Sequence, residues 1–435
     1  MKRQRTLTVL LTLMLVPALL LGNGMNLNGV GSKSVGMGGA FVGLANDFSA
    51  VFYNPAGLSQ LRGTNISIFF TDVIPTGTYK LNVPNMFDID ATTLTNHYIS
   101  GAVAAFFDVG SKIKLGFFAD VPSGLGAEWD GADLAAFSGP AGTTFKWMSK
   151  IGVFNFGPAI SFKASEKFAI GATVNVAYGM MDMQRPVDAM DVSGAQPVPG
   201  SDGFMDAQYT DEGTGMGVGF TLGLMFKPSA KLQFGVSFKS ENTVGFSGTA
   251  KAPLMAMMQQ ATKSDFDRDI TWPIWVGGGV AFMPNEKLTF TADVQWTQWS
   301  TMEKIVTKYA DAFWSGMMAN VGGDEMPFHW EDALQIRFGM QYQLSEMLAL
   351  RVGYYNDPTP GVDETANILL PQVDYNVITF GLGFNAGGLF SFDVGVEYLM
   401  GKDRDIAMTL ADAMPGTHGM NMFVPSVAMH YNLPK

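Results

Sequence analysis

Residues 287–300 read KLTFTADVQWTQWS and alternate apolar with polar side chains along their whole length. Successive side chains of a β-strand point to opposite faces, so this alternation predicts a strand with one oily face and one wet face. The oily face would carry Leu288, Phe290, Ala292, Val294 and Trp296. In a large exported protein such a face is expected to meet lipid, as in a membrane β-barrel.

The same pattern recurs along the chain from residue 64 onward. The expected strands lie at residues 64–74, 97–108, 112–120, 150–164, 167–180, 214–228, 231–247, 270–284, 287–300, 332–345, 347–357, 373–386, 389–401 and 421–433. Their connections alternate between tight turns, such as Gly110-Ser111 and Gly387-Gly388, and long loops. Short turns at one end, long loops at the other and an even number of strands are typical of outer-membrane barrels. We therefore predict an all-β, transmembrane, antiparallel barrel of about fourteen strands, in preference to a soluble β protein.

Composition supports this class and excludes others. The chain has 435 residues, 47% of them apolar, yet no apolar run after the first two dozen residues approaches the ~20 of a membrane helix. The net charge is −12, so we expect no nucleic-acid partner. The absence of cysteine excludes disulfides and thiolate metal sites.

The N-terminal part divides into two segments. Basic residues, an apolar core at residues 7–21 and the small residues Gly22-Asn23-Gly24 form the pattern of a secretory signal peptide, which we place at residues 1–24. An uncleaved anchor is the alternative. Residues 25–62 are rich in Gly, Asn and Ser and show no strand alternation, so we interpret them as a plug inside the barrel or, alternatively, a linker. The barrel itself would occupy residues 63–435.

The sequence shows no enzyme signature. Its four histidines lie far apart and form no metal-binding pair, so we expect no enzymatic activity, no metal and no cofactor. The 29 methionines are more informative, because many fall in the long loops. Met255, Met257 and Met258 lie together in one of them. Methionine suits surfaces that accept varied apolar partners, so these loops either pack together as a cap or form a landing site for a hydrophobic ligand.

Asn54-Pro55-Ala56-Gly57 resembles an element of the N-terminal hatch of the FadL-type long-chain fatty-acid and hydrocarbon transporters of bacterial outer membranes. Other segments resemble the same family and follow in its order, at residues 121–129, 272–275, 294–300, 330–333, 356–360 and 370–371. Each segment alone is only moderately specific, but their shared order is strong. The similarity covers nearly the whole mature chain.

The resemblance implies a fourteen-stranded barrel blocked by a hatch, with ligand captured between the third and fourth long loops. It also implies sideways exit through a kink in the third strand, which we place at Asp120, Val121 and Pro122. Pro122 has no N–H to donate, so strand pairing should fail close to it.

Family members that take fatty acids hold the carboxylate with basic residues. Arg185 lies near one such position, and Lys304 lies two residues from the other, where Val306 stands. This weakened basic pair leaves open an uncharged ligand such as an aromatic hydrocarbon.

These observations predict a monomeric outer-membrane protein that takes up hydrophobic molecules, either long-chain fatty acids or hydrocarbons, by passive diffusion. Its partners would be that small ligand and outer-membrane lipid. A general porin or a surface adhesin is the alternative. A plug distinguishes a transporter of hydrophobic molecules from a general porin, because a general porin needs an open lumen.

Overall fold

The structure is a computed structural model, and it describes residues 24–85, 87–137, 144–187, 207–320, 322–410 and 413–433. All of the expected signal peptide except Gly24 lies outside these residues, as do Met190 and Met205 of the long loop after residue 187. Within the described part of the chain, no helix combines the length and the apolar character that crossing a membrane requires.

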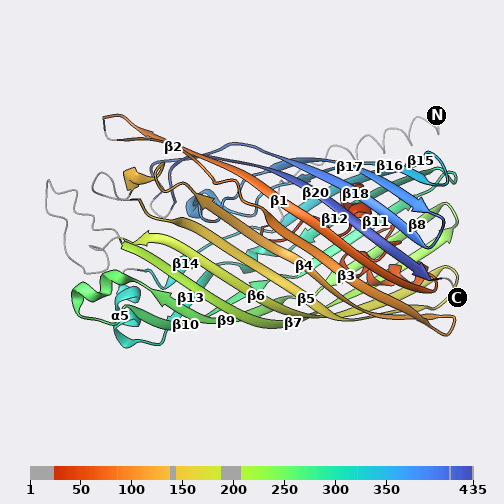
Figure 1. The fold of residues 1–435 in the computed structure, drawn as a ribbon, viewed down its shortest axis with the longest axis horizontal. Coiled ribbons are helices and arrows are strands. Elements are labelled where there is room, and N and C mark those ends of the chain that lie inside the picture. The colour runs from red at the N-terminus through yellow and green to blue at the C-terminus, as the bar shows by residue number, and fades with distance from the viewer. Residues whose placement is uncertain are drawn as a thin grey trace, which may run out of the picture.

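One antiparallel sheet closes on itself, because β1 pairs with β3 on one side and with β20 on the other (Figure 1). Among the described residues its wall has fourteen positions. They are filled by β1 (Thr64–Val83), β3 (Tyr98–Val109), β4 (Ile113–Trp129), β5 (Trp147–Lys163), β6 (Phe168–Val187), β7 (Ala207–Ser229), β8 with β9 (Leu232–Lys239 and Asn242–Lys251), β10 with β11 (Lys263–Trp272 and Trp275–Phe282), β12 (Leu288–Thr297), β15 (Ala333–Gln343), β16 (Leu348–Asp357), β17 (Tyr375–Ala386), β18 (Phe390–Gly401) and β20 (Gly416–Leu433). The fold class and the strand count predicted from the sequence are confirmed.

Smaller elements gather at the end of the barrel opposite the tight turns, where Figure 1 shows β2 and α5. They are β2 (Phe87–Thr92), η2 (Ala135–Phe137), η3 (Pro253–Met258), η4 (Trp299–Thr301), β13 (Lys304–Tyr309), α5 (Ala312–Asn320), β14 (Glu325–Pro327), η5 (Asp363–Thr365) and β19 (Arg404–Ile406). Several expected loops, among them residues 75–96, 121–149, 181–213 and 248–269, were assigned too long, because wall strands continue into each of them. In these parts the side chains still alternate between inward and outward, but the outward ones, such as Lys80 and Asp267, are polar.

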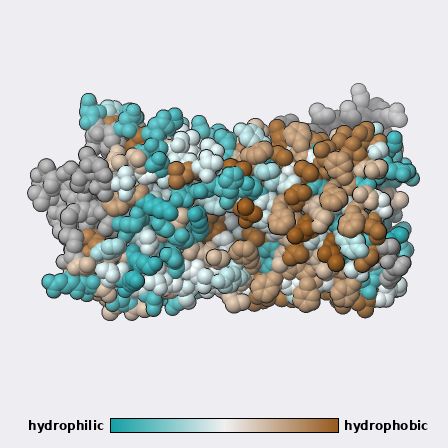
Figure 2. Space-filling view, viewed as in Figure 1, coloured by the Kyte–Doolittle hydropathy of each residue, from teal (hydrophilic) through white to brown (hydrophobic). Residues whose placement is uncertain are grey.

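The outer surface of the barrel has two zones. Large apolar side chains point outward at the tight-turn end, among them Phe117, Val218 and Phe380, which are 67%, 67% and 60% exposed. Figure 2 shows this apolar surface over the right half of the barrel and a hydrophilic surface over the left half. Such a band is stable only against lipid, so the tight-turn half is the part suited to a membrane and the other half projects from it.

The N-terminal segment fills the lumen at the tight-turn end, where Figure 1 shows it in red. It contains α2 (Ser32–Val35), α3 (Ala50–Tyr53) and η1 (Pro55–Gln60), and we call residues 24–62 the hatch. Its buried Phe41, Phe48 and Leu58 join inward Phe69 and Phe106 of the wall in one apolar cluster. The prediction of a barrel with an N-terminal plug in its lumen is therefore confirmed.

Wall glycines let the hatch backbone lie directly against the sheet. A Cβ atom on Gly353 would lie 2.1 Å from the backbone nitrogen of Gly38, and one on Gly235 would lie 2.0 Å from the carbonyl oxygen of Val42. Inward polar side chains then pair with the hatch backbone. The Val42 N–H donates to Asp293 (2.7 Å), because a buried N–H needs an acceptor.

The Asn54-Pro55-Ala56-Gly57 element is one of the places where the hatch contacts the wall. The Asn54 side chain accepts a hydrogen bond from the Ala56 N–H (3.1 Å) and caps η1, while its amide donates to the carbonyl oxygen of Leu224 in β7 (2.9 Å). Pro55 suits the first turn of a helix, where its missing N–H has no partner to lose. A Cβ on Gly57 would lie 2.0 Å from the carbonyl oxygen of Ala45, so no larger residue fits.

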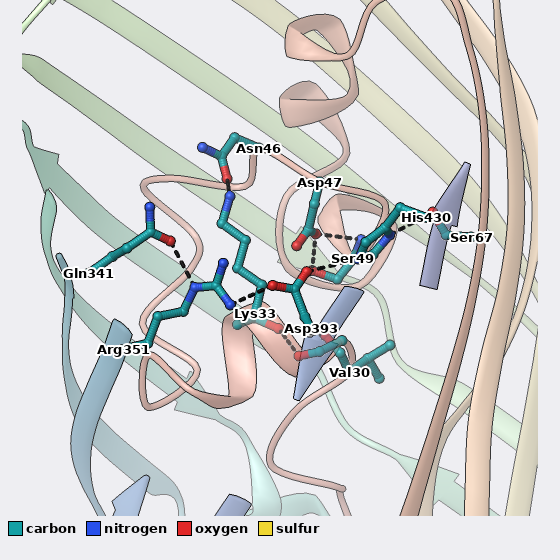
Figure 3. A network of polar contacts seen from close by, with 12 residues as sticks. Val30, Lys33, Asn46, Asp47, Ser49, Ser67, Gln341, Arg351, Asp393 and His430 are labelled. Carbon is teal, nitrogen blue, oxygen red and sulfur yellow. Dashed lines mark hydrogen bonds and ion pairs between the residues drawn. The ribbon is translucent and has the colours of Figure 1, made fainter. Parts of the chain in front are cut away.

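Charged side chains of the wall and of the hatch lie close together near the tight-turn end (Figure 3). In the wall, Asp393 accepts hydrogen bonds from Arg351 (2.5 Å) and lies 3.0 Å from Nε2 of His430. Beside them, Lys33 of α2 donates to Asn46 (2.7 Å). Burial lowers the pKa of the Lys33 ammonium, and the nearby charge of Asp47 opposes that shift. The buried Asp393 and Arg351 of the wall form an ion pair, as burial of a charge requires.

Candidate functional site

The wall is broken at β4, the third wall strand. Against β5 the register shifts between Asp120 and Ser123, so Val121 and Pro122 together form a β-bulge. Against β3 the pairing ends at Ala102 and Asp120. The strand does not end there, since β4 continues to Trp129. Beyond Asp120 one edge of β4 is therefore free of its wall neighbour.

The first residues of the hatch occupy this free edge. The Leu27 N–H donates to the carbonyl oxygen of Pro122 (2.9 Å), and the Gly124 N–H donates to that of Met25 (3.1 Å). Asn26 and Ser123 form an isolated antiparallel bridge. The hatch thus supplies partners for backbone groups of β4 that would otherwise be unpaired at membrane depth, where water cannot replace them.

A cavity of about 630 Å³ lies at this break. Its outer side is lined by outward-facing residues of neighbouring strands, including Ile99, 78% exposed, and Met180, 48% exposed. Its inner side reaches the luminal residues Asp357 and Glu397, both buried. We call it the window cavity, because its lining joins the lipid-facing surface to the lumen. Of the three predicted exit residues, Val121 lines the window cavity, whereas Asp120 and Pro122 are not part of its lining.

Above the window, buried apolar side chains from the loop elements and the upper strands form one cluster, which we call the loop cluster. It includes Met255 of η3, with 1% exposed, and Trp314, Met317 and Met318 of α5. Met258 packs against it partly buried. The side chain of Met257 is outside the described structure. In this structure the described methionines of η3 and α5 belong to, or pack against, this one buried cluster, and the predicted role of Met255, Met257 and Met258 in ligand binding stays a prediction.

The two predicted basic residues lie in different settings. Arg185, near the end of β6, stacks its guanidinium over the ring of Tyr209 at 5.3 Å. Lys304, at the start of β13, is half exposed and forms an ion pair with Glu325 (2.7 Å). The neighbouring side chains Ile305 and Thr307 are the ones that point inward.

Sequence reasoning missed a third basic residue, Arg268 of β10. Its guanidinium is buried below the loops and pairs with Asp211 (2.7 Å), which also accepts a hydrogen bond from Tyr209 (3.2 Å). The tyrosine hydroxyl in turn lies 2.8 Å from that of Tyr309. The only sequence signal was inward alternation, since Arg268 falls between inward Phe266 and Ile270. Because its charge is already paired, Arg268 is poorly placed to hold a ligand carboxylate.

Comparison with known proteins agrees with this geometry. Residues 14–432 match the family model described as outer membrane protein transport protein (OMPP1/FadL/TodX). The chain belongs to this family. A long-chain fatty acid transport protein of Salmonella typhi is 21% identical over 399 residues, covering 86% of this chain and 87% of that protein.

Solved structures of similar fold cover nearly the whole chain. A FadL homologue of Pseudomonas aeruginosa has a TM-score of 0.77 at 16% identity, covering 94% of this chain and 100% of the other. The toluene transporter TodX of P. putida has a TM-score of 0.72 at 17% identity, with the same two coverages. The protein is thus a FadL/TodX-family barrel of the outer membrane.

Proposed function

We propose that this barrel takes up hydrophobic molecules by passive diffusion, binding them beneath its external loops and releasing them sideways through the window cavity. The observation that carries the proposal is the window cavity itself. An apolar molecule that reaches the lumen beside Asp357 has a lined path to Ile99 and Met180 on the lipid-facing surface. The polar outer leaflet resists such molecules, and the route bypasses it.

The hatch argues against a general porin. Its backbone meets the wall at Gly235 and Gly353 with no room for a methyl group, so the hatch lies inside the lumen directly against the wall. A ligand descending from the loops therefore meets the hatch, and the window lies above that obstruction. Relatives described as long-chain fatty acid and toluene transporters support a hydrophobic ligand. We also infer that Met255 and Met258 belong to the capture region, because the loop cluster extends to Ile151 and Met181 of the window cavity.

Straightening β4 tests the route. Deleting Val121 and replacing Pro122 by Val would pair β4 with β5 one residue against one, removing the bulge while keeping Asp120 and Ser123 on the inner face. Uptake of radiolabelled toluene and oleate by cells producing the variant should fall to background. The matched control is Pro122→Val alone, which restores an N–H but keeps the extra residue. Undiminished uptake through a correctly folded, straightened barrel would reject sideways release and favour passage down the lumen.

A further inference from the structure

A second, smaller cavity lies inside the barrel behind the β4 bulge, with a volume of about 90 Å³. Phe52 of the hatch and residues 26–28 form one side, and inward side chains of β4 to β8 form much of the other. It shares residues 26–28 of the hatch and Ser123 of β4 with the window cavity, so the two cavities adjoin across these residues. We call it the inner cavity.

Three wall strands are interrupted at the level of the inner cavity. Besides the bulge in β4, β8 gives way to β9 after Lys239, and β10 gives way to β11 at Pro273-Ile274. The last two breaks face each other, because Lys239 pairs with Trp275 and Asn242 with Trp272. Interrupted strands re-aim side chains, and residues beside all three breaks line the cavity.

The polar atoms of this lining are not satisfied by the protein. Asp120 Oδ1, Asn155 Oδ1, Asn242 Oδ1 and Trp272 Nε1 are buried and have no hydrogen-bond partner among the described residues. All four side chains line the inner cavity, and the Asp120 residue is only 5% exposed. Proteins rarely leave buried polar groups unpaired, and four around one small space indicate that something polar fills it.

Lys239 adds a positive charge to the same cavity. Its ammonium lies 3.6 Å from the ring centroid of Phe52 and 4.7 Å from that of Trp275. Among the described residues no carboxylate lies within ion-pair distance of it. The two rings hold the ammonium by cation–π attraction, which leaves its N–H groups free to donate. The cavity therefore offers donors from Lys239 and Trp272 and acceptors from Asp120, Asn155 and Asn242.

We propose that the inner cavity binds the hydroxyl group of an uncharged amphiphile, an alkanol or a phenol, whose apolar part lies toward the window cavity. This inference rests on the proposed function and names the ligand class. A hydroxyl donates one hydrogen bond and accepts two, which matches a site that offers both acceptors and donors. A pure hydrocarbon leaves every one of these groups unpaired.

A carboxylate fits this lining less well. Placed beside Asp120, it would be opposed by like charge or would have to share a proton with it. The adjoining window cavity is lined by the acidic residues Asp182, Asp357 and Glu397, which would also oppose a carboxylate ligand. The basic residue in its lining, Lys150, is already paired with Glu128. The inner cavity is also lined by Arg337, whose N–H groups are already bonded to Asn28, Gly38 and Gln335. The carboxylates of the window cavity therefore carry the selection against acidic ligands and in favour of neutral ones.

The test uses three probes of the same ring size: toluene, p-cresol and 4-methylbenzoate. Calorimetric titration of the purified full-length barrel in detergent should show p-cresol binding about 10-fold more tightly than toluene, the gain from hydrogen bonds to a charged donor. Lys239→Met keeps the apolar stem between Phe52 and Trp275 and should reduce that preference to below about twofold. Asp120→Asn should raise the affinity for 4-methylbenzoate, because it removes the like charge while Lys239 remains. Lys251→Met, which removes an exposed ammonium on neighbouring β9, is the matched control and should change none of the three.

Each outcome decides the matter. Equal binding of toluene and p-cresol, or a hydroxyl preference that survives Lys239→Met, overturns the proposal and leaves the inner cavity as a site for water. Tightest binding of 4-methylbenzoate with dependence on Lys239 also overturns it and makes the cavity an anion site. Failure of all three probes to bind counts against the proposed function as well, whereas binding of toluene without a hydroxyl preference overturns only this inference.

Discussion

The hatch seat, by which we mean the contact of the hatch backbone with the glycines and inward polar side chains of the wall, is buried inside the barrel. The loop cluster is buried as well, but the two regions are built in opposite ways. At the hatch seat, backbone lies against backbone, glycines replace side chains, and polar groups such as Asp293 and Asn54 pair with main-chain atoms. In the loop cluster, Met255, Met317, Trp314 and other large side chains fill the space. The hatch seat has no room for larger side chains, whereas the flexible methionines of the loop cluster can repack. The difference supports our proposals that the hatch obstructs the lumen and that ligand is captured at the loop end.

The sharpest way to break the comparison is to add volume at the hatch seat. Gly235→Val would place its Cβ 2.0 Å from the Val42 carbonyl oxygen, and because that oxygen belongs to the backbone no side-chain rotation relieves the clash. We expect loss of the folded barrel, seen as loss of the heat-modifiable band on an electrophoresis gel. Gly278→Val is the control on the neighbouring strand β11, where a Cβ meets no atom within 4 Å. If Gly235→Val folds as well as the control, the hatch is loosely held and the contrast fails.

The second test concerns the ion pair at the base of the loop cluster. Asp211→Leu strands the Arg268 guanidinium, whose side chain is 7% exposed, in an apolar surrounding. The free energy of unfolding in detergent should fall by about 3–5 kcal/mol, because an uncompensated buried charge is costly.

The double variant Asp211→Leu with Arg268→Met is its control. It should recover most of that loss, since replacing a buried pair by apolar residues is often nearly neutral. A double variant as unstable as the single one would show that the Tyr209 and Tyr309 hydroxyls, rather than the charges, dominate this network.

The contrast between the two regions also marks what sequence reasoning reached. The alternation of apolar and polar residues predicted the wall strands, because successive side chains of a strand point to opposite faces of the sheet. The predicted number of strands follows from the same pattern. The plug was recognisable because residues 25–62 lack that alternation. Pattern alone does not report depth, so the upper parts of β1 and β10, which rise beyond the apolar band, were taken for loops.

The candidate site was harder to predict, since its contacts join residues far apart in the chain. Asn28 donates to Asp357 across 329 positions, and no local spacing encodes such a pair. Lys239 and Arg268 were missed for a related reason. Each is one inward polar residue in an alternating strand, and its neighbours decide whether its charge is paired. Pro122 was different, because a missing N–H has a local consequence that can be read from the sequence.

The smallest expected effect separates the two basic residues that the family resemblance suggested. Lys304 is half exposed and pairs with Glu325 on the barrel exterior, so Lys304→Met should cost less than about 1 kcal/mol in unfolding free energy. We also expect it to leave oleate binding within about twofold, because an exposed ion pair is screened by solvent. Arg185→Met is the matched comparison, since that guanidinium stacks on Tyr209, a member of the loop cluster. A large loss of oleate binding in Lys304→Met, with Arg185→Met unchanged, would place carboxylate recognition on the outer face of β13. It would also show that ligand capture begins outside the loop cluster, contrary to the arrangement argued from the two interiors.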